Sequence, residues 1–538
     1  MNNHASSTGS PRFPTFGRLF RWFFSRRTLG RILVGLAALV TLVALVCTEE
    51  SWRGKRAWER YKHELEAQGE KLDWNNYVPP PVPDQQNFAM TPFLAPLFDF
   101  NPSPRKEGQS LWRDTNGYNR ISSFQGRLGT AEQATADHDQ PRTEQRMTDL
   151  QGWAAALTSH TNQAPAAAAP SLTRAEAAAD VLRGLAKDDL IVEELRSASQ
   201  RPYARFNVRY EEDFAPAILL PQLACMKSAT VLFQVRASAE LALDQTDQAW
   251  ADTKMALYLA DTLKDEPFLI SKLVQVAIVH LSLKPIWEGL AGHKWSDAQL
   301  AEIELRLGQI NLLADAAMRG ERALSLRTIE QLRDHGIIDA EDSSKRLPRL
   351  ASLLLGGFFY QNELSIARTY QQFFVPVADA ANQRMFPSRA IANDTALQDA
   401  LAGGFRPYKL FARMLLPALV GAETKFAFGQ TRVNQAIVAC ALERYRLAEG
   451  RFPESLEPLS PRFLPSMPHD VITGAPFIYR RAPDGQFILY SVGWNEKDDG
   501  GAIVLPGGKD HKRDLTEGDW VWKYPTPAPP PAQNAATQ

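Results

Sequence analysis

Apolar residues recur at helical spacing over a long central part of the chain, beginning at Thr173. Thr173 and Glu176 have the spacing of a capping box at a helix start, and Ser296 and Gln299 repeat it later in the chain. Between these signals, residues 214–290 read as almost continuous helix, with breaks at Pro221, near Gln245 and at Pro267. The pattern predicts a mainly α protein with a multi-helix domain over residues 171–404.

One segment of this domain, LDQTDQAWADTKMALYLAD, resembles the turn and second helix of a tetratricopeptide repeat. Ala249 and Ala256 lie seven residues apart, where that family needs small residues so that paired helices can approach. No 34-residue period recurs along the chain. Two interpretations therefore remain open: a layer of helical hairpins, which we favour, and a true repeat array.

Helical spacing continues beyond Ser296, first in AQLAEIELRLGQINLLADAAMRGERALSLRTIEQL and then, after a polar patch at 339–346, in LPRLASLLLGGFFYQNELSIARTYQQFF. Leu353, Leu354 and Leu355 form an apolar run that is too short to cross a bilayer. We expect this run to be a core or docking segment.

The most apolar segment lies near the amino end, where Ile32–Cys47 contains 16 residues without a charge. A bilayer core needs about 20 apolar residues, and Leu29 and Gly30 extend the run if Arg31 reaches the interface. We predict a transmembrane signal anchor at residues 29–48. Residues 1–28 are rich in arginine and should lie in the cytoplasm, while the rest of the chain follows outside.

Three other interpretations of this segment fit its residues less well. A cleaved signal peptide needs small residues after the apolar run, and LVCTEESW lacks an A-x-A-like site. SRRTLGR resembles a twin-arginine export signal but has Leu29-Gly30 in place of the usual Phe-Leu. Val46 precedes Cys47 where a lipoprotein motif needs glycine or alanine. An uncleaved anchor in a bacterial inner membrane is the favoured prediction.

Residues 49–170 are predicted to hold a charged stalk helix, a proline-rich extended segment and a linker. Trp52, Trp58 and Tyr61 suit anchoring at the membrane interface, although a solvated stalk would look the same. The proline-rich segment that follows cannot be helical at its prolines. Its apolar residues indicate that it lies against a folded surface: Phe88, Met90, Phe93, Leu94, Leu97 and Phe98.

The remaining parts of the chain are polar or of low complexity. Residues 101–140 read as irregular, 162–171 (NQAPAAAAPS) as a linker or exposed loop, and 525–538 as a disordered tail. Sixty basic and sixty-one acidic residues give a net charge of −1, which does not favour a nucleic-acid partner. Cys225 and Cys440 could pair in an oxidising compartment, but both lie on apolar helical faces, so buried free thiols are expected.

The carboxyl-terminal part, residues 405–524, changes to a mixed pattern. A long helix from Pro417, amphipathic over Arg432–Leu447, ends at Gly450. Phe477 alternates with Tyr479, and Phe487 with Leu489, so two strands joined by an APDGQ turn are predicted. A helix packed on a small antiparallel sheet is the economical arrangement.

Residues 410–501 resemble the soluble part of the major pseudopilin of type II secretion systems, a relative of type IV pilins. The resemblance rests on Pro417, on the helix exit ALERYRLAEGRFPESLEPL, on LPSMPHDVITGAPFIYR and on FILYSVGWNEKDDGG. The chain lacks the family's processed start and apolar half-helix: Arg406, Lys409 and Arg413 stand before Pro417. We therefore expect a recognition module rather than a filament subunit. The whole chain resembles uncharacterised single-pass bacterial membrane proteins.

In that family the acidic loop binds calcium, and the resemblance carries this role to Asp498 and Asp499. Glu496 lies nearby, and backbone carbonyls around Ser491 and Gly493 are possible further ligands. The alternative is a solvated acidic turn without an ion. Calcium is the one cofactor that the sequence suggests.

No P-loop, nucleophile elbow, zinc motif or dinucleotide fingerprint occurs. His280 reads as a core or interface histidine, and His469-Asp470 as a turn in which Asp470 caps backbone amides. Glu211, Glu212 and Asp213 could be an acid pair for hydrolysis but better suit a cap on a helix near Phe214.

We therefore predict a non-enzymatic, membrane-anchored periplasmic scaffold or interaction protein with a protein partner in the cell envelope, associated with a secretion-like assembly. The alternative is a periplasmic hydrolase or ligand-binding protein with a site between the helical layers.

Overall fold

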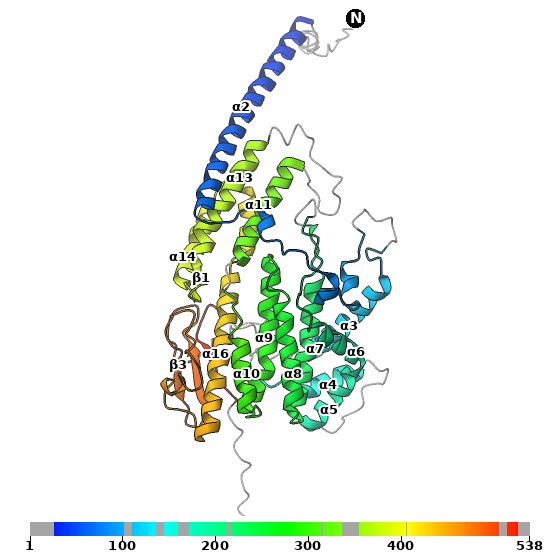
Figure 1. Cartoon of the computed structure of the whole chain (residues 1–538). Coiled ribbons are helices and arrows are strands. Elements are labelled where there is room, and N and C mark those ends of the chain that lie inside the picture. The colour runs from blue at the N-terminus through cyan, green and yellow to red at the C-terminus, as the bar shows by residue number, and fades with distance from the viewer. Residues whose placement is uncertain are drawn as a thin grey trace, which may run out of the picture.

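The computed structural model of the chain describes residues 26–101, 110–135, 145–159, 172–211, 217–313, 316–335, 355–404, 406–504 and 514–525. A long helix projects from an elongated helical body, and a small sheet lies beside the far end of that body (Figure 1). Within the described residues the protein is mainly helical with two small antiparallel sheets. The predicted mainly α class is confirmed.

The projecting helix is α2 (Arg26–Ala67), a single element of 42 residues. Its amino-terminal part has a window of mean hydropathy 2.4, none of which is buried in the body. The predicted anchor is therefore a helix long and apolar enough to span a membrane. The predicted charged helix after Ser51 is the continuation of this same helix as far as Ala67.

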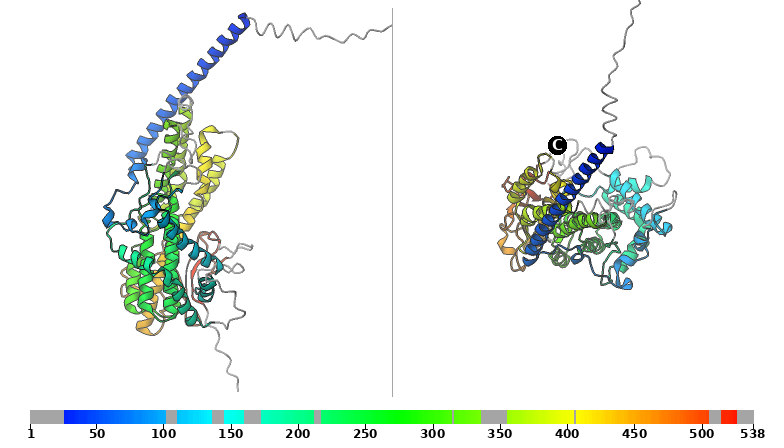
Figure 2. Two further views of the ribbon diagram at one scale, coloured as in Figure 1. Left: turned by 90° about the vertical axis from the view of Figure 1, so that its right-hand side faces the viewer. Right: turned by 90° about the horizontal axis from the view of Figure 1, so that it is seen from above.

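The second half of α2 packs against α13 (Gly356–Thr369), as Figures 1 and 2 show. Two glycines meet at the contact: a Cβ on Gly54 would lie 3.2 Å from the Gly357 carbonyl oxygen. Trp58 is buried there, and the guanidinium carbon of Arg368 lies 5.2 Å from the centre of the Tyr61 ring. The expectation that Trp58 and Tyr61 anchor at the membrane interface or face solvent is therefore wrong, because both face the body.

The proline-rich segment after α2 is laid against the body, as predicted. Phe88 and Leu94 are fully buried, and Phe93 packs edge-on against Phe124 at 5.5 Å. The segment forms short 3-10 turns rather than a uniformly extended strand: η1 (Trp74–Asn76), η2 (Asp84–Gln86), η3 (Phe88–Met90) and η4 (Ala95–Phe98).

Two helices occur in a stretch for which no helix was predicted: α3 (Thr115–Ala134) and α4 (Leu150–Ser159). Three glycines and several Ser and Thr residues weaken the helical signal of α3. Its buried residues are nevertheless spaced as one helical face: Ile121, Phe124, Leu128 and Ala131. Both helices pack against the central domain, α4 against α5 and α3 against α7.

The central domain consists of helices whose starts agree with the predicted signals. Both capping boxes are formed, one at Thr173 and one at Ser296. The helices are α5 (Arg174–Leu185), α6 (Asp189–Ala198), α7 (Gln222–Ala242), α8 (Thr246–Asp261), α9 (Leu269–Ala291), α10 (Asp297–Leu307) and α11 (Ala316–His335). The breaks near Gln245 and at Pro267 are confirmed. The prediction of helix from Phe214 to Pro221 is wrong where the structure describes it, because residues 218–220 are not helical and α7 begins only after Pro221. The run after Ser296 is divided into α10 and α11.

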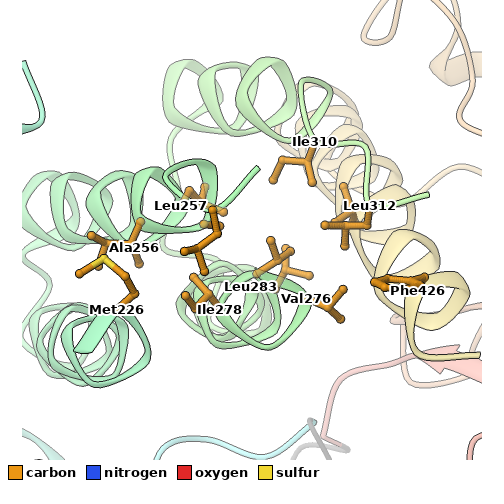
Figure 3. Packing of buried hydrophobic residues seen from close by; sticks show 14 of the residues in the cluster. Met226, Ala256, Leu257, Val276, Ile278, Leu283, Ile310, Leu312 and Phe426 are labelled. Carbon is orange, nitrogen blue, oxygen red and sulfur yellow. The ribbon is translucent and has the colours of Figure 1, made fainter. Parts of the chain in front are cut away.

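The helices α7, α8 and α9 pack side by side (Figure 3). Met226 of α7, Ala256 of α8 and Ile278 of α9 are buried in this layer. Ala249 and Ala256 have no exposed surface, in agreement with the predicted close approach of the hairpin. Cys225 and Cys440 are buried and free, as expected.

After α13 the chain forms a short π-helical turn (Tyr370–Phe374), a hairpin of β1 (Ala378–Asp379) and β2 (Arg384–Met385), α14 (Pro387–Leu401) and α15 (Leu410–Leu415). Pro417 lies in a 3-10 turn, Leu416–Ala418, and the long helix α16 (Ala422–Glu449) starts only after Gly421. The prediction of one helix from Pro417 is therefore wrong at its start. Its end is right, because Gly450 has φ +74° and stops the helix.

The predicted hairpin is confirmed as β3 (Ile478–Arg481) and β4 (Phe487–Ser491), with Tyr479 opposite Leu489. A third strand that the sequence did not predict, β5 (Trp520–Trp522), pairs with β4. The helix α16 packs on this sheet through Gln435, whose side chain donates to the Trp520 carbonyl at 2.6 Å.

The other side of α16 contacts α9 and α10, so the helix lies between the sheet and the central helices. Every residue from Phe426 to Glu443 is buried. The expectation of an amphipathic helix with one exposed face is wrong over this stretch. Its polar side chains instead find partners inside the protein, as Gln430 does with the Leu312 amide at 2.8 Å.

Several predictions fall on residues outside the described ranges. They concern most of the basic segment 1–28, the linker 162–171, Glu212 and Asp213, the polar patch 339–346, Leu353 and Leu354, and the tail from 526 onward.

Candidate functional site

The acidic loop predicted to bind calcium follows β4 and turns at Trp494–Gly501. The Asp498 carboxylate accepts hydrogen bonds from the Tyr490 hydroxyl at 3.0 Å and the Gly500 amide at 2.9 Å. Asp499 accepts from the Asn495 side chain at 2.9 Å. Asp498 therefore caps a turn of the loop, and Asp499 holds the neighbouring Asn495 side chain.

A third carboxylate, missed in the sequence, lies under the same loop. Asp519 has no exposed surface and accepts from the Gly501 amide at 2.6 Å and the Asp499 amide at 3.3 Å. Burial raises its pKa, and the charges of Asp499 and Asp498 act in the same direction. Among the described residues no group of three or more metal-ligating side chains could hold an ion. Calcium at Asp498 and Asp499 stays a prediction.

A second candidate site is a cavity of about 460 Å³ between α3, α4, α7, α9 and α16. One face of α9 lines it at helical spacing with Ala277, His280, Leu281 and Lys284, while α7 contributes Lys227, Val231 and Gln234. The volume falls in the usual range for small-molecule sites, about 300–1,000 Å³.

The lining combines aromatic and cationic groups. Trp153 of α4 and Trp287 of α9 supply indole surface, and three helices each supply one cation: Lys227, Lys284 and Arg432. Arg432 is buried, stacks over Trp522 at 4.7 Å and donates to the Val521 carbonyl at 3.0 Å. Lys284 lies 5.4 Å from the Trp287 ring and donates to the Arg146 carbonyl.

The acids at the cavity have partners that explain them. Glu132 forms an ion pair with Lys227 at 3.6 Å, and Asp149 caps α4 by accepting from the Gly152 amide at 2.9 Å. The cations of the lining outnumber these two acids by one. The arrangement suits a ligand with an apolar body and a negative charge.

A buried polar network supports the wall of the cavity. Glu288 accepts from both the amide and the hydroxyl of Thr148 at 2.6 Å, and Arg174 pairs with its other oxygen at 3.4 Å. Gln234 and Ser238 extend the network from α7. A signal for this network was present in the sequence, because Glu288 is an acid within a strongly apolar helix.

The residues singled out for chemistry do not come together. His280 reaches the cavity and packs edge-on against Phe428 at 5.2 Å, whereas Glu211 is exposed outside the cavity lining. Asp470 accepts from the Ile472 amide at 3.0 Å, which confirms its role as a turn cap. His469 bonds backbone carbonyls of the β1–β2 turn.

Acids with strongly raised pKa values lie elsewhere. Burial raises the pKa of Glu266 and Glu304 to about 7 and that of Glu363 to about 8. Glu304 borders a second hollow, of about 710 Å³, between α10 and α16, where it pairs with Arg444 at 2.8 Å. Glu363 pairs with Arg333. Each of these acids belongs to a buried structural pair or hydrogen-bond network, away from the α7–α9–α16 cavity.

Comparisons with known proteins supply no relative: no family model, no curated protein and no solved structure matches the chain.

Proposed function

We propose that the chain is a membrane-anchored interaction protein whose helical body is presented close to one face of the membrane. The observation that carries this proposal is α2, whose apolar part is exposed while its continuation is packed into the body. A helix that is continuous through both regions couples the body to the bilayer without a flexible joint. This rigid coupling suits a scaffold, whose body stays at a fixed place on the membrane. It suits less well a domain on a flexible tether, which samples a large volume around its anchor.

The charges around α2 support an orientation with the amino end in the cytoplasm and the body in the periplasm. Arg26, Arg27 and Arg31 precede the apolar residues, while Glu49 and Glu50 follow them. Basic residues flanking a span remain on the cytoplasmic side.

The carboxyl-terminal module is proposed to recognise a partner in an envelope or secretion-like assembly. The support is the pseudopilin-like order of elements: a helix stopped at Gly450, then the β3–β4 hairpin, then the acidic loop. Leu447, in the last turn of α16, is an exposed residue of this module.

Membrane anchoring is tested by placing two arginines in α2, Leu39→Arg and Leu42→Arg. Each arginine in the middle of a span costs about 2.5–3.5 kcal/mol of insertion free energy. We expect the variant to leave the membrane fraction after an alkaline wash, while the matched Leu190→Arg variant on α6, at an 80% exposed position, stays membrane-bound. Retention of the double variant would overturn the proposal. Reporter fusions before Arg26 and after Tyr524 test the orientation separately.

The partner is tested by photo-crosslinking from Leu447 and from Leu190 in intact membranes. We expect a discrete crosslinked protein from Leu447 and none from Leu190. Equal patterns from the two positions would contradict recognition by the carboxyl-terminal module.

The cavity favours a second candidate function, the binding of a small amphiphilic anion. Trp153, Trp287 and the three cations are the observation behind it. Decanoate is a suitable probe and decanol its uncharged control. Decanoate should raise the melting temperature and quench indole fluorescence, and Lys284→Gln should weaken both effects. Equal responses to decanoate and decanol would show that the cations take no part.

A further inference from the structure

The end of the body beside α2 carries an exposed patch that neither the anchor nor the carboxyl-terminal module explains. It is formed by the segment between α14 and α16 together with Leu355, the residue that precedes α13. We define the membrane-proximal patch by its exposed aromatic and aliphatic residues Leu355, Tyr408 and Leu410 and its cations Arg406, Lys409 and Arg413.

The position of the patch along α2 is fixed by direct contacts. The Tyr408 hydroxyl donates to the Glu50 carboxylate, and the Gly357 amide donates to the Ser51 hydroxyl at 2.9 Å. The apolar segment ends at Cys47, three residues before Glu50. With a rise of about 1.5 Å per residue, Tyr408 lies roughly 5 Å beyond the end of that segment. This is the depth of lipid headgroups.

The cations of the patch form no ion pair with any described residue. Arg406 and Lys409 donate to the Ala400 carbonyl at 3.2 and 3.0 Å, and Arg413 donates to the Gly404 carbonyl at 3.4 Å. Cations at the end of α14 stabilise that helix. This role needs no exposed apolar neighbours, whereas Tyr408 and Leu410 expose 41% and 45% of their surface.

Aromatic side chains, aliphatic side chains and cations together are the combination that binds a membrane surface. Trp and Tyr settle at the headgroup level, and cations attract anionic lipids. A protein partner would not explain why the patch lies level with the end of the span.

We propose that this patch docks onto anionic lipid headgroups of the same bilayer that α2 crosses, and so fixes the tilt of the body on the membrane. The inference rests on the proposed membrane anchoring. Removal of each cation should lower the equilibrium constant for docking about fivefold, because each contributes about that factor in attraction to an anionic surface. High salt should also weaken docking, because salt screens the attraction between the cations and the anionic lipid.

The test uses nitroxide labels on the full-length chain in vesicles of phosphatidylcholine with or without phosphatidylglycerol. Cys47→Ser removes the accessible thiol, and Cys225 and Cys440 are buried. Single cysteines are placed at Leu410 in the patch, at Leu42 in α2 and at Leu305 on α10, which is 69% exposed. Depth is read from the accessibility of each label to oxygen and to a water-soluble nickel chelate.

We expect Leu42 to report the hydrocarbon, Leu410 the headgroup region in anionic vesicles only, and Leu305 water throughout. The variant Arg406→Gln, Lys409→Gln, Arg413→Gln should return the Leu410 label to water while Leu42 stays inserted. A Leu410 label in water beside an inserted Leu42 label overturns docking and leaves anchoring intact. A Leu42 label in water overturns both. Insertion of Leu410 without anionic lipid overturns the role of the cations.

Discussion

Within the described part of the chain, two helices are long and apolar enough to cross a membrane, and they have opposite surroundings. In α2 the apolar window has mean hydropathy 2.4 and none of it is buried; in α9 the window has mean hydropathy 1.4 and is 61% buried. Length and composition therefore do not separate a span from a core helix. The surrounding structure separates the two cases, because other helices of the protein pack against α9 on most sides.

The polar residues of the two helices also differ. Between Ile32 and Cys47, Thr41 is the single polar side chain, and its hydroxyl bonds the Ala37 carbonyl within the helix at 2.8 Å. In α9, Lys272 and Glu288 are buried and bond groups from other parts of the chain. Charged residues with tertiary partners mark an apolar helix as part of a protein interior.

The largest expected effect comes from an acid placed in the buried face of α9. Ile278 has no exposed surface, so Ile278→Asp introduces an unpaired carboxyl and should cost about 3–5 kcal/mol of unfolding free energy. Ile270 lies on the same helix and is 51% exposed, so Ile270→Asp should change it by less than about 0.5 kcal/mol. Urea unfolding of the detergent-solubilised chain, followed by circular dichroism, measures both. Similar losses of unfolding free energy in the two variants would mean that burial of its apolar face does not stabilise α9.

A second expectation concerns pH and the buried acid just before α9. Burial raises the pKa of Glu266 to about 7, although Ser271 and Gln222 donate hydrogen bonds that act the other way. Between pH 4.5 and about 7 the folded chain holds a proton that the unfolded chain has released. The contribution of Glu266 to stability therefore falls as pH rises, by about 1.4 kcal/mol per unit and about 3 kcal/mol in all.

Glu266→Gln removes this titration, so its unfolding free energy should fall less than that of the parent between pH 5 and 7. Glu59→Gln, at an exposed position of α2, is the matched control. Parallel pH profiles for the parent and Glu266→Gln would show that Glu266 is ionised in the folded protein.

A third expectation concerns the point where α2 passes from exposed to packed. A Cβ on Gly357 would lie 2.7 Å from the Glu50 carbonyl carbon, so Gly357→Val must push α2 and α13 apart. We expect a loss of about 1–3 kcal/mol, seen as faster hydrogen exchange in residues 50–60. Gly35→Val has open space around it and should leave this exchange unchanged. Unaltered exchange in Gly357→Val would mean that the two helices are not rigidly packed.

Much of this fold could be predicted from local signals. The capping boxes at Thr173 and Ser296, the stop at Gly450 and the β3–β4 hairpin depend on neighbouring residues, so the sequence reveals them. The strand β5 could not be predicted, because it is stabilised by pairing with β4, from which a long connection separates it in the sequence. The burial of α16 on all sides likewise depends on α9, α10 and the sheet.

The candidate sites likewise combine residues that a local motif reveals with residues brought together from distant segments. Asp498 and Asp499 were found because the acidic loop is a local motif, whereas Asp519 approaches the loop from a separate segment. The cavity draws its cations from α7, α9 and α16, which lie far apart in the sequence. Of its polar residues the sequence pointed to His280, and as a core or interface histidine.

The smallest expected effect concerns that loop, far from the membrane end of α2. A calcium site with a Kd of about 10⁻⁴–10⁻³ M stabilises the folded chain by about 0.4–1.4 kcal/mol at 1 mM calcium. We expect calcium to raise the melting temperature slightly and Asp498→Asn to abolish the calcium-dependent part. Asp484 caps the β3–β4 turn through the Gln486 amide at 3.0 Å, so Asp484→Asn is a matched loss of a capping carboxylate outside the predicted site. If EGTA leaves the melting temperature of the parent unchanged, the acids of this loop serve the turn alone.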